Sequence, residues 1–315
     1  MKQKNTRQMF KTGFDQSLGL VEMTDERLEQ MKRVLLGMLR DITAALDARK
    51  IRFALAGGSA LGAVRHGGFI PWDDDIDLII PRSDYDRLLD EFDEILGDGY
   101  LLCTPERTPD HGMLNAQIKK KGTVYQSFNE LSKAPESCGV CVDIFIIENV
   151  SNNGLLRRLH GVLALAAGYL STCRKTYHDL PYLERFLTPG SESARAFRKK
   201  ARIGGWFRWL SLDWVTHFAN RCYSLCKNHR SRMVTIPSGR NHFFGELQKR
   251  EDVCESVRVN FAGLQVPVPK GYDAYLTGLY GPDYMTPPPA GKRESHPIMA
   301  LDLGEIPADK TGEDV

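Results

Sequence analysis

The sequence lacks an uncharged segment long enough to span a bilayer. Its longest stretch without Asp, Glu, Lys or Arg covers residues 159–173, and about fifteen residues is fewer than the roughly 20 that a membrane-spanning helix needs. We therefore expect a buried helix there. Residues 1–14 hold four basic side chains and no apolar run, so we expect no signal peptide.

Cysteine pairs are also missing. The seven cysteines are odd in number and scattered along the chain, which is typical of reduced thiols in a cytoplasmic protein. Cys138 and Cys141 have the spacing of half a zinc site, but no second pair of Cys or His follows at a usual distance. Structural zinc is therefore disfavoured.

A strong net charge is missing as well, since 42 Lys and Arg against 40 Asp and Glu leave +2. The balance is uneven, because residues 157–208 hold eleven basic and three acidic side chains. Basic and aromatic side chains alternate in the later part of that segment: Arg195, Phe197, Arg198, Lys199, Lys200, Arg202, Trp206, Phe207, Arg208 and Trp209. Two interpretations stay open, an interfacial helix on an anionic membrane and a solvated basic face over an apolar core. No nucleic-acid reader motif accompanies the charges, so nucleic acid is a disfavoured partner.

The most informative pattern that is present is acidic. Ile76, Leu78 and Ile80 lie on one face of a period-two strand, so Asp75 and Asp77 share the other face, roughly 7 Å apart. Two such carboxylates repel each other unless a cation lies between them. Hard oxygen ligands select Mg²⁺ or Mn²⁺. We therefore predict a divalent metal site here, the alternative being an edge strand whose aspartates face water.

A glycine turn lies upstream of the acidic strand. Residues 52–56 have the pattern of a short strand, and Gly57 and Gly58 let the backbone turn without a Cβ. Residues 59–66 then have the pattern of a short helix, which Ser59 is placed to cap. Because N–H groups exposed at a helix start bind phosphate oxygens, the turn and the strand together predict metal-dependent chemistry on a phosphate.

A third aspartate interrupts a nearly continuous apolar strand. Residues 140–147 are Val-Cys-Val-Asp-Ile-Phe-Ile-Ile, and a buried charge without a partner is costly. Alternation places Asp143 on the face of Cys141 and Phe145, where strand pairing could bring it to Asp75 and Asp77. We therefore predict that Asp143 joins the metal site.

The remaining periodicity predicts the rest of the fold. Apolar spacing predicts helices over 24–49, 83–96, 154–177 and 214–228, a strand over 114–119 and a hairpin over 257–269. The expected fold class is α/β (α+β), a mixed sheet core flanked by helices, with a largely helical C-terminal half. We expect a catalytic core over 1–150, a second region over 151–303 that completes the site, and a flexible tail over 304–315.

These motifs together resemble the nucleotidyltransferase fold, and within it the LicD family of phosphotransferases, which is related to the fukutin-related ribitol-phosphate transferases. Three blocks carry the resemblance: 62–77, Gly-Ala-Val-Arg-His-Gly-Gly-Phe-Ile-Pro-Trp-Asp-Asp-Asp-Ile-Asp; 141–145, Cys-Val-Asp-Ile-Phe; and 279–296, Leu-Tyr-Gly-Pro-Asp-Tyr-Met-Thr-Pro-Pro-Pro-Ala-Gly-Lys-Arg-Glu-Ser-His. Residues 155–240 are much less distinctive.

The resemblance implies Mg-dependent transfer of a phospho-alcohol, phosphocholine before others, from a CDP-alcohol donor to a sugar hydroxyl of a cell-surface glycan or glycolipid precursor, with release of CMP. Relatives that carry ribitol or glycerol phosphate leave the alcohol open. The alternatives are a nucleotidyltransferase that moves NMP from an NTP to a small molecule, and a non-catalytic nucleotide-binding protein. We expect a cytoplasmic protein, with peripheral contact at the inner face of the cell membrane left open.

The resemblance also implies roles for the motif residues. Asp75 and Asp77 would hold two metal ions against the diphosphate, Asp143 would complete the second ion or accept the acceptor's proton, and Asp73 would be an outer ligand. The expected phosphate or nucleotide contacts are Gly57, Gly58, Ser59, Arg65, His66, Lys119, Lys292, Arg293 and His296. Three aromatic side chains are candidates for the face of a choline ammonium: Trp72, Phe145 and Tyr284.

Overall fold

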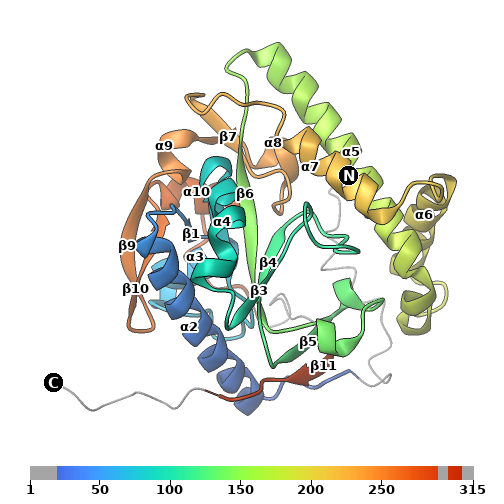
Figure 1. Ribbon diagram of the computed structural model, residues 1–315, viewed down its shortest axis with the longest axis horizontal. Coiled ribbons are helices and arrows are strands. Elements are labelled where there is room, and N and C mark those ends of the chain that lie inside the picture. Colours follow the sequence, from blue (N-terminus) through green and yellow to red (C-terminus); the bar gives the residue numbers. More distant parts are fainter. Residues whose placement is uncertain (1–19, 290–296, 307–315) are drawn as a thin grey trace.

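A mixed β-sheet lies at the centre of the protein (Figure 1). The computed structural model describes residues 20–289 and 297–306. The strand order is β1-β2-β6-β4-β3, and β7 and β8 extend the sheet from β6. The strands are β1 (Ala54–Leu55), β2 (Asp77–Pro81), β3 (Tyr100–Cys103), β4 (Ala116–Lys120), β6 (Cys141–Asn149), β7 (Met233–Thr235) and β8 (Gln248–Lys249). The expected mixed α/β class is confirmed.

The parallel pair of strands β2 and β6 forms the middle of this sheet. Both strands are strongly apolar. Val142, Ile144 and Ile146 share one face of β6 and are all buried, whereas Cys141, Asp143 and Phe145 on the other face are only partly buried. β1 and β4 pair antiparallel with the outer sides of β2 and β6. The parallel register sets Asp77 opposite Asp143, so the two aspartates are neighbours as expected.

Two long helices with the expected bounds cover this sheet. Helix α2 (Asp25–Ala48) begins after Thr24, whose Oγ1 accepts a hydrogen bond from the amide of Arg27 at 3.3 Å. Its buried residues recur at helical spacing: Met31, Val34, Leu35, Met38, Leu39, Ile42 and Leu46. Helix α4 (Arg82–Ile95) buries Tyr85, Leu88 and Phe92. The short helix α3 (Gly57–His66) connects β1 to the segment before β2.

The C-terminal part of the chain returns to the sheet region. The expected hairpin is confirmed as β9 (Ser256–Phe261) and β10 (Leu264–Pro269). Its turn uses Ala262 and Gly263, both at positive φ (50° and 88°), as a two-residue hairpin loop requires. Three short helices follow or precede it: α8 (His242–Gly245), α9 (Arg250–Val253) and α10 (Tyr272–Tyr280). A separate strand pair joins β5 (Val124–Ser127) to β11 (Ile298–Asp302).

Three helices form a second layer, opposite α2 in Figure 1. They are α5 (Gly154–Leu183), α6 (Glu192–Trp206) and α7 (Leu212–Tyr223); single 3-10 turns lie at Phe128–Glu130, Pro135–Ser137 and Glu184–Phe186. None of the helices in the described part of the chain is long and apolar enough to cross a membrane. The expectation of a buried helix over 159–173 is wrong in one respect. The small residues of α5 face inward, while Leu159 and Val162 are 59% and 62% exposed.

Three local differences from the expectations concern the site. β1 is only two residues long. Helix α3 begins at Gly57 rather than Ser59, and no side chain caps it. The sheet also recruits β7 and β8 from beyond residue 150, so the central sheet draws strands from both sides of the expected boundary. Residues 307–315, most of the expected tail, lie outside the described residues.

Candidate active site

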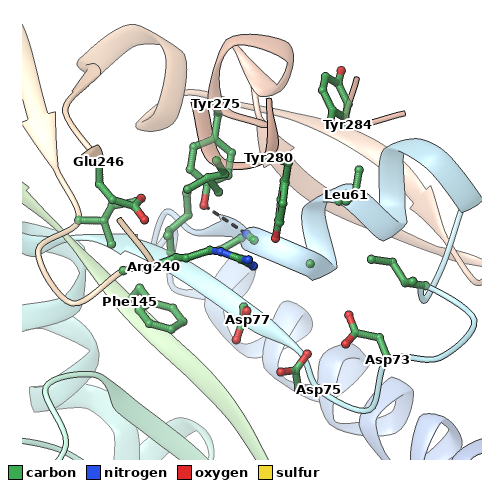
Figure 2. Close-up of a pocket in the computed structure, with 18 of the residues that line it drawn as sticks. Leu61, Asp73, Asp75, Asp77, Phe145, Arg240, Glu246, Tyr275, Tyr280 and Tyr284 are labelled. Carbon is green, nitrogen blue, oxygen red and sulfur yellow. Dashed lines mark hydrogen bonds between the residues drawn. The ribbon is translucent and has the colours of Figure 1, made fainter. Parts of the chain in front are cut away.

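A cavity of about 570 Å³ opens where α3 begins and β2 starts. Two segments far apart in sequence form its walls. The first holds the glycine turn, Arg65 and the acidic strand, and the second runs from β7 through α8 and α10 to the turn after it. Figure 2 shows side chains from both segments pointing into the same space. Nine of the residues expected from the sequence line it: Gly57, Gly58, Arg65, Trp72, Asp73, Asp75, Asp77, Phe145 and Tyr284.

Three carboxylates lie along one wall of this cavity. Asp73, Asp75 and Asp77 all line it, and Figure 2 shows their side chains in a row. Ile76 between them is fully buried while Asp75 and Asp77 both line the cavity, so the two carboxylates lie on the same side as expected, although the strand β2 begins only at Asp77 and Asp75 precedes it. Asp74 is 5% exposed and is absent from the cavity wall, as the alternation indicates.

Asp143 lies beside Asp77 through the parallel register of β6 and β2. Two amide side chains from the segment around β4 hold its carboxylate. Asn115 Nδ2 and Gln117 Nε2 donate to the same oxygen, Asp143 Oδ1, at 3.1 and 2.8 Å. Neither amide was predictable from the sequence, because nothing in the chain marks Asn115 or Gln117 as partners of a residue more than 25 positions away.

The glycine turn packs directly against the acidic wall. An added Cβ on Gly58 would lie 2.8 Å from Asp73 Oδ2, and one on Gly57 would lie 3.1 Å from Asp77 Oδ2. Gly57 also has a positive φ of 48°, which disfavours other residues. Its amide donates to the hydroxyl of Tyr275 at 3.2 Å. Both positions therefore require glycine for the turn and the carboxylates to approach this closely.

Ser59 has a different place from the one expected. It lies within α3, is 4% exposed and is absent from the cavity wall. Its Oγ accepts a hydrogen bond from the amide of Asp77 at 2.9 Å. The capping prediction is therefore wrong: Ser59 ties α3 to the start of β2 and thereby fixes the backbone of Asp77.

Arg65 and His66 separate in the structure. Arg65 lines the cavity and donates to the carbonyl of Tyr284 at 2.8 Å, while its Nε donates to Nε2 of His66 at 2.9 Å. His66 does not line the cavity. Partial burial, and then the charge of Arg65, lower the pKa of His66. The expected contact between His66 and phosphate has no support in this geometry, because the imidazole faces Arg65.

The second wall brings residues that the sequence analysis missed. Arg240 lies over the ring of Tyr280 at 5.5 Å, and both line the cavity. Glu246 also lines it although it is 2% exposed, and it accepts a hydrogen bond from the amide of Asn241 at 3.1 Å. Burial raises the pKa of Glu246 to about 7, against the smaller opposing effects of Asn241 and Arg240. Arg240 lies at the end of the segment 155–240 that looked least distinctive, Glu246 lies just beyond it, and Tyr280 belongs to the block 279–296.

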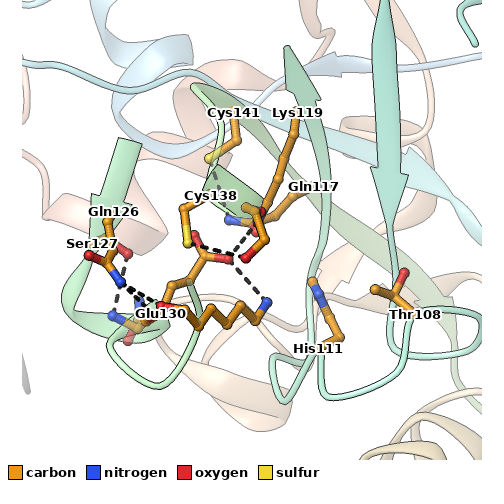
Figure 3. Close-up of polar contacts among 12 residues, drawn as sticks. Thr108, His111, Gln117, Lys119, Gln126, Ser127, Glu130, Cys138 and Cys141 are labelled. Carbon is orange, nitrogen blue, oxygen red and sulfur yellow. Dashed lines mark hydrogen bonds and ion pairs between the residues drawn. The ribbon is translucent and has the colours of Figure 1, made fainter. Parts of the chain in front are cut away.

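Lys119 lies in a buried ion cluster and not in the cavity (Figure 3). Its ammonium donates to Glu130 Oε1 at 2.5 Å, and both side chains are 2% exposed. Lys133 approaches the same oxygen at 3.1 Å. Burial opposes charge on Lys119, but the attraction and hydrogen bond of Glu130 outweigh it and raise the pKa. An internal ion pair therefore replaces the expected phosphate contact.

Three predicted basic contacts, Lys292, Arg293 and His296, lie outside the described residues. The chain does reach the cavity just before them, since Asp283, Tyr284, Thr286 and Pro288 line it. The hydroxyl of Tyr284 donates to Asp273 at 2.8 Å, which holds this turn against α10.

The carboxylate wall has the donor chemistry of a hard divalent cation. Within residues 20–289 and 297–306, no three carboxylate, imidazole or thiol groups are gathered closely enough to hold a metal by themselves. Mg²⁺ in phosphate-transfer sites is commonly held by one or two carboxylates together with substrate phosphates and water. Asp75 and Asp77, which line an open cavity beside a glycine turn, fit that incomplete kind of site.

Comparisons with known proteins agree with this architecture. Residues 50–153 match the family described as LicD/FKTN/FKRP, nucleotidyltransferase domain. The chain is 26% identical over 288 residues to the lipopolysaccharide cholinephosphotransferase LicD of Haemophilus influenzae, which covers 86% of this chain and 96% of that protein. It is also 48% identical over 52 residues to the ribitol 5-phosphate transferase FKRP of Homo sapiens and of Mus musculus, 16% of this chain and 10% of those proteins.

The matched family domain contains the three carboxylates that line the cavity and the aspartate beside them. Residues 50–153 contain α3, the segment that leads into β2, β2 itself and β6, and these hold the four aspartates Asp73, Asp75, Asp77 and Asp143. The chain thus carries a LicD-family domain, as its motifs indicated, and both named relatives are transferases of a phosphate-linked alcohol. The second wall, with Arg240 and Tyr280, lies outside that domain.

Proposed function

We propose that this protein, whose residues 50–153 form a LicD-family domain, transfers a phospho-alcohol from a CDP-alcohol to a sugar hydroxyl of a glycan and releases CMP. The observation that carries the proposal is the acidic wall: three aspartates and a glycine turn face one cavity, with a fourth aspartate paired beside them. The same proposal names phosphocholine as the first donor group to test, because the relative matched over most of the chain is named a cholinephosphotransferase.

The reaction moves one phosphorus between two oxygens. The acceptor hydroxyl attacks the phosphorus that bears the alcohol, the bond from this phosphorus to the bridging oxygen breaks, and CMP leaves with that oxygen. The acceptor's proton passes to a base. Positioning and charge neutralisation supply most of the catalysis in such transfers.

The residues in and beside the cavity would each contribute differently to this reaction. The start of α3 offers the backbone N–H of Gly58 and the positive end of a helix dipole to the diphosphate, whereas the N–H of Gly57 is donated to Tyr275. Arg240, on the opposite wall, offers a guanidinium to the leaving CMP. Asp143, which is held by two amides beside Asp77 and does not itself line the cavity, is the proposed acceptor of the hydroxyl proton.

Divalent metal is part of the proposal, with Asp75 and Asp77 as the residues that would hold it and Asp73 as an outer ligand. Bound Mg²⁺ or Mn²⁺ would neutralise charge on the diphosphate and on the attacking and leaving oxygens. Without a cation, three carboxylates beside a phosphate site would repel the donor.

The aromatic lining supports a cationic alcohol. Trp72, Phe145, Tyr280 and Tyr284 all line the cavity, and quaternary ammonium groups bind to aromatic faces. A neutral polyol such as ribitol would gain less from these rings. We therefore expect CDP-choline to bind more tightly than CDP-ribitol or CDP-glycerol.

Thermal denaturation of the full chain tests the proposal. The melt is recorded with Mg²⁺ and, in separate samples, CDP-choline, CDP-ribitol, CDP-glycerol, CTP, ATP or UTP. A ligand at about 100 times its dissociation constant adds roughly 2.7 kcal/mol to the free energy of unfolding. We expect a CDP-alcohol to stabilise the wild type only with Mg²⁺, and to lose that effect in the Asp75→Asn/Asp77→Asn variant.

The control is Asp90→Asn. This aspartate lies on α4, is 75% exposed and does not line the cavity. This variant should keep the full ligand response. Stabilisation by a nucleoside triphosphate alone would favour a nucleotidyltransferase instead. No response to any nucleotide would contradict the proposal.

A further inference from the structure

Helix α5 has its large apolar side chains on the outside. The residues that face inward are small or polar: His160, Gly161, Ala164, Ala167, Gly168 and Ser171. On the outer face, Leu155, Leu159, Val162 and Tyr169 are 67%, 59%, 62% and 48% exposed. These four positions recur every three, four or seven residues and therefore form one stripe along the helix, about 21 Å long at 1.5 Å per residue.

This apolar stripe differs from scattered exposed apolar residues, which are normal on protein surfaces. It is contiguous, and Leu156 and Leu163 beside it are also exposed (56% and 42%). Figure 1 shows the first half of α5 along an outer edge of the molecule, with no other element outside it. Exposed apolar surfaces of this kind mark sites of interaction.

The surroundings of the stripe are basic. Arg158 lies one turn after the start of α5. Helix α6 crosses the far end of the same face of α5, because an added Cβ on Gly204 of α6 would lie 2.1 Å from the carbonyl of Cys173 of α5. The outward side of α6 carries Arg195, Lys199, Arg202 and Trp206, which are all exposed and recur at helical spacing. Because α6 lies over that face of α5, its outer side faces the same way.

We infer that α5 and α6 together form a docking surface for an anionic lipid bilayer. Apolar side chains flanked by Arg, Lys and Trp are the composition of helices that lie in a membrane interface, and clustered cations bind anionic headgroups. A second copy of this chain would bring the same positive charges against one another, which disfavours self-association through this face.

The proposed docking surface is joined to the cavity through α8. His242 of α8 lines the cavity, and Phe244, two residues on, packs on α5, where an added Cβ on Gly161 would lie 2.3 Å from its ring. Phe244 contacts the inward face of α5, so a bilayer on the outer face would be separated from α8 by the thickness of α5. The docking inference itself does not depend on the proposed reaction.

Vesicle co-sedimentation of the full chain tests this inference independently of any activity. We expect binding to phosphatidylcholine vesicles that contain phosphatidylglycerol, with weaker binding when the anionic lipid is omitted or salt is raised. Leu159→Glu/Val162→Glu should weaken binding about tenfold or more, because two apolar contacts are lost and two repelling charges are gained. Lys199→Ala/Arg202→Ala should weaken only the binding to anionic vesicles.

The matched control is Leu101→Glu, which changes a leucine that is 51% exposed on β3. This control should bind like the wild type, and circular dichroism melts should show that all variants are folded. Equal binding by Leu159→Glu/Val162→Glu, or no binding by the wild type, would overturn the inference. So would a wild type that sediments as a dimer and becomes monomeric in this variant without binding vesicles.

Discussion

The sheet region and the helical region place their polar and apolar groups in opposite ways. Around β2 and β6, large apolar side chains fill the interior, and charged groups gather at one cavity. In α5, small residues face the interior, and leucine and valine face outward. We assign the first arrangement to the proposed phosphate-containing donor and the second, an extended exposed apolar surface, to the proposed bilayer contact.

We also expect substitutions in the two regions to change different properties, activity in the sheet region and stability in the helical region. In the sheet region, the carboxylates are the proposed metal ligands and line one cavity, so their loss should cost activity rather than stability. In the helical region, close approach of backbones depends on glycine, so its loss should cost stability. Four predictions follow this contrast, from the largest effect to the smallest.

Removal of charge from the acidic wall should give the largest effect. We expect Asp75→Asn and Asp77→Asn each to lower the rate of phospho-alcohol transfer about a thousandfold or more, because each removes a proposed metal ligand and charge stabilisation in the transition state. The melting temperature without ligand should not fall, since repulsion between the carboxylates is relieved. Transfer rates and melts of the same samples measure both quantities, and a loss of activity explained by unfolding would contradict the assignment.

Two adjacent glycines of α6 test the close packing of the helical region. Gly204→Ala should lower the free energy of unfolding by about 1–3 kcal/mol, the usual cost of overpacking, because its Cβ would lie 2.1 Å from the carbonyl of Cys173. Gly205→Ala is the matched control, since its Cβ would meet only the ring of Tyr177 at 3.1 Å. Urea unfolding measures both. Equal stabilities of the two variants would mean that α6 and α5 are not packed this closely.

The amides that hold Asp143 should act on the rate through that carboxylate. We expect Asn115→Ala and Gln117→Ala each to lower kcat about tenfold, the scale of a mispositioned catalytic group, with little change in KM for the donor. In an Asp143→Asn background the same substitutions should cost almost nothing further. Full additivity in this double-mutant cycle would show that the amides act on something other than Asp143.

Glu246 should give a smaller effect that depends on pH. Its pKa of about 7 in the folded protein lies above the usual value near 4.5, so between these values the folded state holds a proton that the unfolded state has lost. Stability therefore falls as pH rises through this range. Glu246→Gln should melt higher than the wild type at about pH 8 and nearly the same at about pH 4.5. A difference that does not change with pH would contradict this titration.

Local patterns allowed much of the site to be predicted. Strict alternation indicates that Asp75 and Asp77 share a face, and one charge in an apolar strand indicates that Asp143 needs a partner. The bounds of α2, α4 and the β9–β10 hairpin likewise depend on nearby residues. Each of these predictions required only spacing within a few residues, which the chain displays directly.

Contacts between distant segments were not predictable in this way. Serine is a residue type that commonly caps helices, but the Ser59 hydroxyl instead accepts a hydrogen bond from the amide of Asp77. Lys119 ends a strand near the site, yet a loop brings Glu130 to it. Arg240 and Glu246 enter the cavity only because β7 joins the sheet beside β6. An uncharged run such as 159–173 shows apolar content without showing which side faces solvent.

Release of CMP from CDP-choline is the most direct assay of the proposed transfer. The wild type, Asp75→Asn/Asp77→Asn and the Asp90→Asn control would be compared with Mg²⁺ and with chelator, together with the mass of a lipopolysaccharide acceptor. We expect the wild type and the Asp90→Asn control to form CMP and phosphocholine-bearing acceptor in equal amounts, and only when Mg²⁺ is present. The double variant should form neither product. CMP formation that persists in the double variant, or pyrophosphate release from CTP in its place, would contradict the proposed transfer.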